Sequence, residues 1–273
     1  MSGPAAGTAA KRPGGATVER RGAAAAPPGT WRGVALVARR ELASYFDSAI
    51  AYVYTIACVV LANSIFMNEF FLAGAADMSA YFDLLPLLLP FFLPAISMRL
   101  WAEERKQRTL ELLLTLPIRP LQAILGKYAA ALALYGLFLA GSLPIVAMLF
   151  ALGDPDPGLI AGGYLGLLLF GALFLAFGAL LSALSGDQIV AFVTGTAVGF
   201  AFVLTGHDRV VAVLDGLAPG WAPGTLLYES FSVMPHYDAC VRGVVELSSL
   251  VYFGALSAVF LWATGFVLER YRT

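Results

Sequence analysis

Six long apolar stretches limit what this chain can fold into, because each is close to the length that crosses a lipid bilayer. A helix needs about 20 mostly apolar residues to span the hydrocarbon core. The stretches that reach or approach this length cover residues 49–68, 81–100, 123–152, 159–184, 188–206 and 248–268. We therefore predict an all-α integral membrane protein with six transmembrane helices.

The composition agrees with a membrane protein. Of the 273 residues, 59% belong to the hydrophobic set and 13% are charged, whereas an average soluble chain has roughly 45–50% and about 25%. A soluble domain could not hide this much apolar surface from water. The formal net charge is −1, so no basic field would attract nucleic acid. These values exclude an ordinary cytosolic enzyme, a disordered regulator and a nucleic-acid-binding protein.

The basic residues predict how the chain is oriented, because cytosolic loops carry an excess of lysine and arginine. Seven basic residues precede Ser48, six lie in 99–127 and two lie in 270–273. The opposite side keeps only Arg209 and Arg242. Six spans with both termini in the cytosol give this distribution, and we expect the inner membrane of a bacterium.

The sequence outside the spans divides into regions of different character. Residues 1–30, rich in Ala, Gly and Pro and without a continuous apolar core, are predicted to form a disordered cytosolic tail. Residues 31–48 mix apolar and charged positions, which predicts an amphipathic helix in the membrane interface. A polar linker is the alternative, disfavoured by aromatic residues such as Trp31 and Phe46. Residues 49–273 are predicted to form the six-span domain.

One long segment of that domain is neither a span nor a free loop. Residues 207–247 contain Pro219, Pro223 and Pro235 among many apolar residues. The segment is too polar to span and too apolar to be fully solvated, so we predict a short re-entrant or interfacial helical segment on the outer face.

A dense cluster of charges follows the second span and forms a predicted cytosolic segment, residues 101–120. Opposite charges separated by three or four residues can meet on a helix surface, so the helix is expected to continue out of the membrane until Pro117 and Pro120 break it. These pairs are Glu103 with Lys106, Glu104 with Arg108, and Arg108 with Glu111. The leucine-rich half of the segment needs another surface to cover it. The residues alone leave open whether the segment is a hairpin that sets topology or a docking element for a partner.

A resemblance rests on this cluster. The run Leu93-Pro-Ala-Ile-Ser-Met-Arg-Leu-Trp-Ala-Glu-Glu-Arg-Lys-Gln-Arg-Thr-Leu-Glu-Leu-Leu-Leu-Thr-Leu-Pro117, followed by Leu125-Gly-Lys127, resembles the permease subunits of type-2 ABC exporters. It is similar, more narrowly, to the gliding-motility permease and to the copper-processing permease of nitrous oxide reductase maturation. Residues 235–253 resemble the segment before the last span of those permeases. Arg108 departs from the pattern, where a glycine is expected, and so does Ser248-Ser249, where a charged pair is expected.

The resemblance, which covers residues 31–273, implies a subunit that docks cytosolic ABC ATPase subunits and pairs with a second copy of itself or a related permease. It implies coupling helices between spans two and three and between spans four and five, and it leaves room for a periplasmic accessory partner. The residues on the matching motif, expected to act in coupling or gating, are Glu103, Glu104, Arg105, Thr109 and Glu111.

We expect another chain to bind and hydrolyse ATP. A phosphate-binding loop needs a glycine five residues before Gly126 and a hydroxyl after Lys127, but this sequence has Leu121 and Tyr128 there. This chain is therefore predicted to be no enzyme and to hold no cofactor, and a partner subunit would bind ATP and Mg. The permease would couple ATP hydrolysis to export or to conformational signalling. The sequence leaves three outputs open: export of a lipid, export of a polymer, or transmission of motion without transport.

Proline and glycine patterns mark two spans. Pro86, Pro90 and Pro94 recur every fourth residue of the second span, so this helix should be kinked. We interpret it as a mobile gate helix; a static kink packed against neighbours is the alternative. Gly-x-x-x-Gly pairs, Gly162/Gly166 and Gly195/Gly199, permit close helix contact, either inside the chain or between subunits.

Two further patterns are weighed and not favoured. His236, Asp238 and Cys240 alternate and carry ligand atoms that suit a soft metal, but a helix would spread them apart, so no metal site is predicted. Ser185 and His207 invite comparison with an intramembrane serine protease, although they lie at opposite ends of the fifth span. A protease or a membrane scaffold unrelated to ABC transporters is the alternative to the permease.

Overall fold

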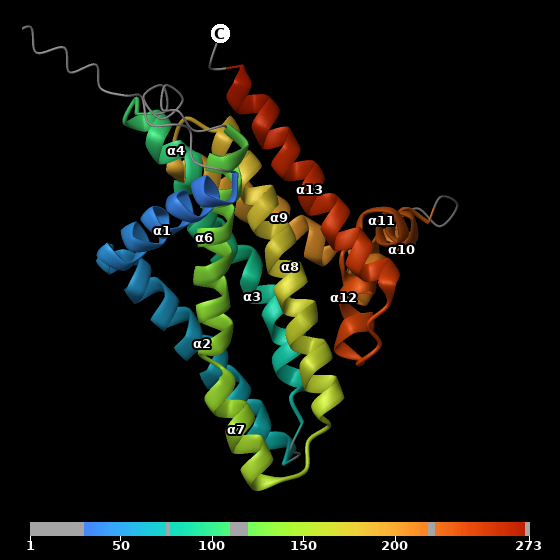
Figure 1. Cartoon of the computed structure of the whole chain (residues 1–273). Coiled ribbons are helices and arrows are strands. Elements are labelled where there is room, and N and C mark those ends of the chain that lie inside the picture. Colours follow the sequence, from blue (N-terminus) through green and yellow to red (C-terminus); the bar gives the residue numbers. More distant parts are fainter. Residues whose placement is uncertain (1–29, 75–76, 110–119, 218–221, 271–273) are drawn as a thin grey trace, which may run out of the picture.

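The computed structural model describes residues 30–74, 77–109, 120–217 and 222–270, and every regular element within them is an α-helix (Figure 1). The helices are α1 (Thr30–Asp47), α2 (Ala49–Ala73), α3 (Ser79–Ser97), α4 (Arg99–Lys106), α6 (Pro120–Ala140), α7 (Leu143–Leu152), α8 (Pro157–Leu184), α9 (Gln188–Leu204), α10 (Asp208–Leu217), α11 (Pro223–Phe231), α12 (Met234–Val241) and α13 (Leu247–Glu269).

Five helical stretches of the described chain are long and apolar enough to cross a membrane, which makes the protein a multi-pass membrane protein. They cover Ala51–Ala73, Ser79–Lys106, Pro120–Leu152, Pro157–Leu184 and Leu247–Glu269. The predicted fifth span corresponds to α9, whose 17 residues extend over about 25 Å. A sixth crossing is reached only if α9 and the following helix are counted as one span bent by 83°.

Helix α8 is the centre of the bundle. It contacts α3, α4, α6, α9, α12 and α13 (Figure 1). Its glycines lie where neighbours approach most closely: a Cβ at Gly171 would collide with the ring of Tyr135, and one at Gly178 would collide with Ser97. In lipid, where helices gain nothing by hiding apolar surface from one another, such small residues permit the close packing that holds helices together.

The three prolines of α3 are buried, and two of them pack on the glycines of α9. A Cβ built on Gly195 would lie 3.1 Å from Cβ of Pro94, and one on Gly199 would lie 3.2 Å from Cβ of Pro90. This Gly-x-x-x-Gly pair is therefore used inside the chain. The pair Gly162/Gly166 is also used internally, against Cys240 at the end of α12.

Two of the long spans are interrupted. Only Met98 separates α3 from α4, and Gly141 and Ser142 separate α6 from α7. The 33 residues of the stretch Pro120–Leu152 would be about 50 Å long if continuous, which exceeds a hydrocarbon core of about 30 Å. This stretch is therefore long enough to tilt or to extend beyond the bilayer.

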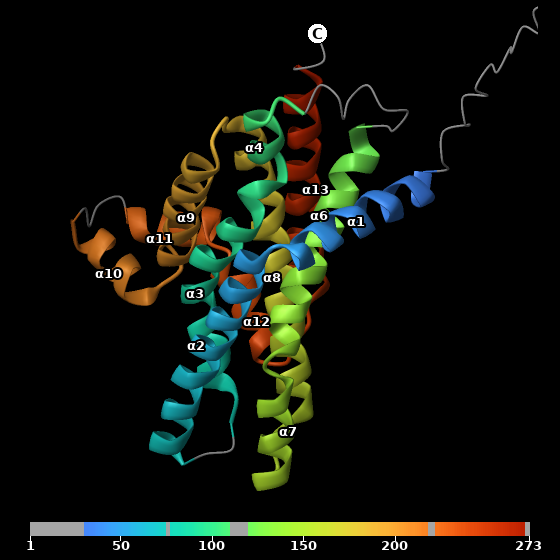
Figure 2. The same ribbon diagram turned by 90° about the vertical axis from the view of Figure 1, so that its left-hand side faces the viewer.

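The described part of the segment 207–247 contains three short helices, α10, α11 and α12. Figures 1 and 2 place α10 and α11 at one side of the bundle, beside α9. The side chain of Asp215 joins the two helices, since it accepts hydrogen bonds from the backbone N–H of Gly224 (2.6 Å) and from the N–H and hydroxyl of Thr225 (3.1 and 2.7 Å). The helical character matches the sequence, and the re-entrant or interfacial position stays a prediction.

The contact between α3 and α9 yields a test. Gly199→Leu would overpack the junction with Pro90 and Phe174, so we expect a loss of about 1–3 kcal/mol in unfolding free energy, visible as a lower midpoint of thermal unfolding in detergent. Gly136→Leu is the matched control, because a Cβ at Gly136 meets nothing within 4 Å. Equal shifts in the two variants would contradict this packing.

Candidate functional site

Helix α4 forms the end of the second span that the charge pattern predicts to be cytosolic, and it is shorter than the sequence suggests. The helix ends at Lys106, and Arg108 follows with a left-handed backbone (φ 56°). The predicted continuation of the helix beyond Lys106 is therefore wrong. The glycine that the resemblance leads us to expect at this position would adopt the left-handed backbone without steric cost.

The two predicted charge pairs that lie within the described residues, Glu103 with Lys106 and Glu104 with Arg108, do not form, and the pair of Arg108 with Glu111 lies outside the described residues. Glu103 accepts a hydrogen bond from Nε of Arg99 at 3.0 Å and one from the side chain of Gln107 at 3.3 Å, rather than pairing with Lys106. Lys106 instead reaches Asp187 at 3.3 Å, in the turn between α8 and α9. Lys106 and Glu104 thus pair with residues outside α4, whereas Glu103 pairs with residues one turn away along its own segment.

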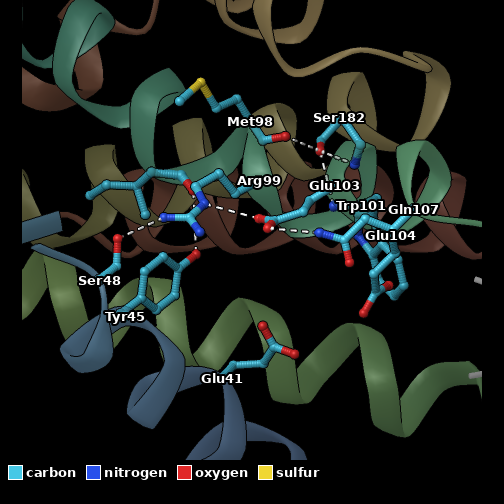
Figure 3. A network of polar contacts seen from close by, with 12 residues as sticks. Glu41, Tyr45, Ser48, Met98, Arg99, Trp101, Glu103, Glu104, Gln107 and Ser182 are labelled. Carbon is cyan, nitrogen blue, oxygen red and sulfur yellow. Dashed lines mark hydrogen bonds and ion pairs between the residues drawn. The ribbon is translucent and has the colours of Figure 1, made fainter. Parts of the chain in front are cut away.

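The centre of the network is a buried lysine. Nζ of Lys127, on α6, lies 3.0 Å from Oε1 of Glu41 and 3.0 Å from Oε1 of Glu104. The lysine side chain is only 4% exposed, and its ammonium group lies 5.3 Å from the ring centroid of Trp101. Figure 3 shows that Glu41 comes from α1 and Glu104 from α4. One cation thus joins the helix before the first span to the second and third spans.

A close approach of α1 and α6 makes this triad possible. A Cβ at Gly126 would lie 2.6 Å from Cβ of Val37, and a Cβ at Gly33 would touch the side chain of Gln122. Without side chains at these two positions, α1 lies directly across α6 (Figure 2). Glu41 therefore reaches Lys127, the residue after Gly126.

A second group of contacts fixes the corner between α1 and α2. Nη1 of Arg99 donates to the hydroxyl of Ser48 at 3.1 Å, and the hydroxyl of Tyr45 donates to the carbonyl of Ile96 at 3.3 Å (Figure 3). Ser48 is the single residue between α1 and α2. The start of the first span is therefore attached to the junction of α3 and α4.

The end of α8 holds α4 from the other side. The Ser182 hydroxyl donates to the carbonyl of Met98 (2.8 Å) and accepts from the N–H groups of Trp101 (3.0 Å) and Ala102 (3.1 Å). These are backbone groups at a helix break, which would otherwise be unsatisfied. Nη1 of Arg105 donates to the carbonyls of Ala183 and Leu184, each at 2.9 Å, and so satisfies the C-terminus of α8.

The turn after α8 belongs to the same network. Oδ1 of Asp187 accepts from the N–H of Ile189 at 2.7 Å and caps α9. This backbone hydrogen bond and the Lys106 ammonium hold the pKa of Asp187 below its usual range. The two segments in which the resemblance implies coupling helices, after span two and after span four, are thus in direct contact.

The structure brings together most of the residues predicted from the motif. Glu103, Glu104 and Arg105 make the contacts described above, and the hydroxyl of Thr109 donates to the carbonyl of Glu104 at 3.4 Å. Glu111 lies outside the described residues. We propose that the coupling role of Glu103, Glu104, Arg105 and Thr109 follows from their place at this junction.

Sequence reasoning missed several members of the network. Lys127 carried a signal, because a lone cation in a predicted span is usually a functional or paired residue. Glu41, Ser182 and Asp187 carried none, since their roles depend on helices that are distant in sequence.

The disfavoured site patterns gain no support. His236, Asp238 and Cys240 lie on helix α12, and the described part of the chain holds no group of three His, Cys, Asp or Glu residues placed to bind a metal. His236 stacks on the ring of Tyr252. Ser185 and His207 flank the 17-residue α9, which separates them by about 25 Å and excludes the proton transfer a protease needs.

Comparison with protein families gives a match over most of the chain. The family model described as ABC-2 family transporter protein matches residues 48–267. No curated protein matches the chain.

The buried lysine yields a stability prediction. Lys127→Met would leave two largely buried carboxylates, 19% and 15% exposed, without their cation, so we expect a loss of about 3 kcal/mol in unfolding free energy. Lys106→Met is the control: that lysine is 62% exposed, and its loss should cost at most about 1 kcal/mol. The triple variant Glu41→Gln/Lys127→Met/Glu104→Gln should regain part of the loss. Thermal unfolding in detergent measures all three, and equal effects at Lys127 and Lys106 would refute the triad.

The left-handed residue gives a second prediction. Arg108→Gly should raise the unfolding free energy by about 1 kcal/mol, because a non-glycine residue in this conformation costs about 1–2 kcal/mol. Arg108→Ala removes the exposed side chain but keeps the steric cost, so it should show no gain. Thermal unfolding midpoints of the two variants decide the matter, and stabilisation by both would point to the arginine charge instead.

Proposed function

The chain belongs to the ABC-2 family of transporter proteins, and on that premise we propose that it couples ATP hydrolysis by a separate ATPase subunit to movement of its own membrane helices. It is the membrane component of an ABC transporter. ATP and Mg would be bound by the partner subunit.

One observation carries the coupling proposal. Lys127 on α6 binds the carboxylates of Glu41 on α1 and Glu104 on α4 at the predicted cytosolic end. The hydrogen bonds of Ser182 and Arg105 attach α4 to a fourth element, α8. A force applied to the segment after α4 would therefore reach α1 and α6 through the triad and α8 through the hydrogen bonds of Arg105. Packed helices linked in this way tend to shift as rigid bodies. The arrangement suits a part that receives motion from outside the membrane.

The same geometry supports a role for α3 as a gate. Its prolines Pro86, Pro90 and Pro94 each remove a backbone hydrogen bond, and α3 leads into α4 after a single non-helical residue. Movement of α4 would reach the middle of the membrane along this helix and its contact with α9. Export of a substrate or signalling to a periplasmic accessory protein would be the output.

The assembly we propose contains two permeases, a second copy of this chain or a related one, because the ATPase sandwich needs two docking surfaces. It would lie in the inner membrane of a bacterium with both termini in the cytosol. The likeness to the gliding-motility and copper-processing permeases is proposed on the motif alone.

A pull-down tests the assembly. The tagged chain, extracted from its native membrane in mild detergent, should bring along a subunit with a phosphate-binding loop, identified by mass spectrometry. A folded, oligomeric chain without any such subunit would favour the scaffold alternative.

A second experiment tests coupling in the recovered complex. Arg105→Ala removes the hydrogen bonds between α4 and the end of α8, and we expect it to lower the permease-dependent ATPase rate by about fivefold or more while the complex still assembles. Arg39→Ala, at an exposed position on α1, is the matched control. Reversing the charge of Glu104 is less suitable, because it would place a second cation against Lys127. An unchanged rate in Arg105→Ala would contradict the proposed role of α4.

A further inference from the structure

The first span, α2, stands apart from the bundle near its inner end. Only 11% of its most apolar window lies buried inside the protein, compared with 61% for the stretch Ser79–Lys106. Two cavities lie against this part of α2, one of about 300 Å³ toward α3 and α9 and one of about 230 Å³ toward α6. Both are lined by Tyr45, Ala51, Thr55 and Leu134. They therefore meet beneath the first two turns of α2 and form one groove, which we name the α2 groove.

The walls of the α2 groove are apolar, and its rims face the membrane. Phe192 and Ile189 line it on the α9 side, and Ile56 and Leu137 line it on the α6 side. Ile189 is 70% exposed, Ile56 59% and Leu137 48%. Apolar cavities do not retain water, and the rim residues Ile56 and Leu137 lie on helices that are long and apolar enough to cross a membrane. From Ala51 to Val59 the groove follows α2 for about 12 Å, which suits an acyl chain lying along the helix.

The inner end of the groove carries a cation. Arg99 lines the larger cavity, where Nε contacts Glu103 and Nη1 contacts Ser48. A guanidinium group has five N–H donors, so three donors of Arg99 have no partner among the residues that the structure describes. Arginine binds phosphate oxygens with charge-assisted hydrogen bonds, and basic pockets between membrane helices on the cytosolic side bind anionic headgroups.

We infer that the α2 groove binds one anionic phospholipid of the cytosolic leaflet, with an acyl chain beneath α2 and the phosphate at Arg99. The combination of an apolar groove, open rims and a cation at the predicted cytosolic end matches the two parts of such a lipid. The site does not depend on the proposed coupling to an ATPase. Because the headgroup would share Arg99 with Ser48 and Glu103, the lipid would help to set the distance between α2 and α3.

Lipid binding to the purified full-length chain tests the groove. Native mass spectrometry would follow titration with phosphatidylglycerol and, separately, with phosphatidylcholine of the same acyl chains. Ala51→Leu fills the point where the two cavities meet, so we expect phosphatidylglycerol affinity to fall by about fivefold or more. Ala57→Leu makes the same change at an exposed position of α2 outside the groove and should bind as the wild type does. Equal binding by the two variants would overturn the site.

The headgroup is tested by charge. The wild type should prefer phosphatidylglycerol by about fivefold, the contribution of one arginine near the membrane surface. Arg99→Gln should abolish this preference, whereas Arg39→Gln, which removes an exposed charge of α1 outside the groove, should keep it. No preference in the wild type, or an unchanged one in Arg99→Gln, would overturn the assignment of an anionic lipid. The Ala51 comparison decides the site even if Arg99→Gln does not fold, and neither assay involves ATP hydrolysis.

Discussion

The arrangement of the helices at the predicted cytosolic end of this protein depends on the free-energy cost of burying one ammonium group, that of Lys127. A buried charge without partners costs several kcal/mol, and a buried ion pair repays this only if its geometry is good. Lys127 is surrounded by Glu41, Glu104 and the ring of Trp101. Each partner comes from an element that must stay in place for the lysine to remain buried. The interaction need not add much net stability to hold α1, α4 and α6 in one arrangement.

In the membrane, by contrast, the fold depends on shape. Lipid is as apolar as the helices, so close contact between small residues replaces the hydrophobic effect. Gly195 and Gly199 admit the prolines of α3, and the glycines of α8 admit Tyr135 and Ser97. Helix α3, whose three prolines remove backbone hydrogen bonds, is therefore supported by α9 at Pro90 and Pro94. That support is compatible with sliding of packed helices, the type of movement that the proposed coupling requires.

The charged end and the packed interior meet at Met98, where α3 passes into α4. The Ser182 hydroxyl satisfies three backbone groups there. The side chain of Arg99, the residue after Met98, donates a hydrogen bond to Ser48 at the corner before α2. The resemblance rests on the sequence of this region, which contains only one side of these contacts. The partners on the other side come from α1, α6 and α8.

The sequence by itself determined that this is a helical membrane protein, approximately where its spans lie, and that the residues after the second span are unusual. These follow from local properties: the length of apolar stretches, the distribution of basic residues, and the spacing of prolines. It did not determine where α4 ends, because the backbone of Arg108 is set by its surroundings. It also did not determine the ion pairs, since Glu103, Glu104 and Lys106 each pair with a residue other than the predicted helical neighbour. Only the tertiary structure decided that Lys127 joins Glu41 to Glu104 and that the glycine pairs serve contacts within the chain, because these interactions depend on distances between helices that no local pattern encodes.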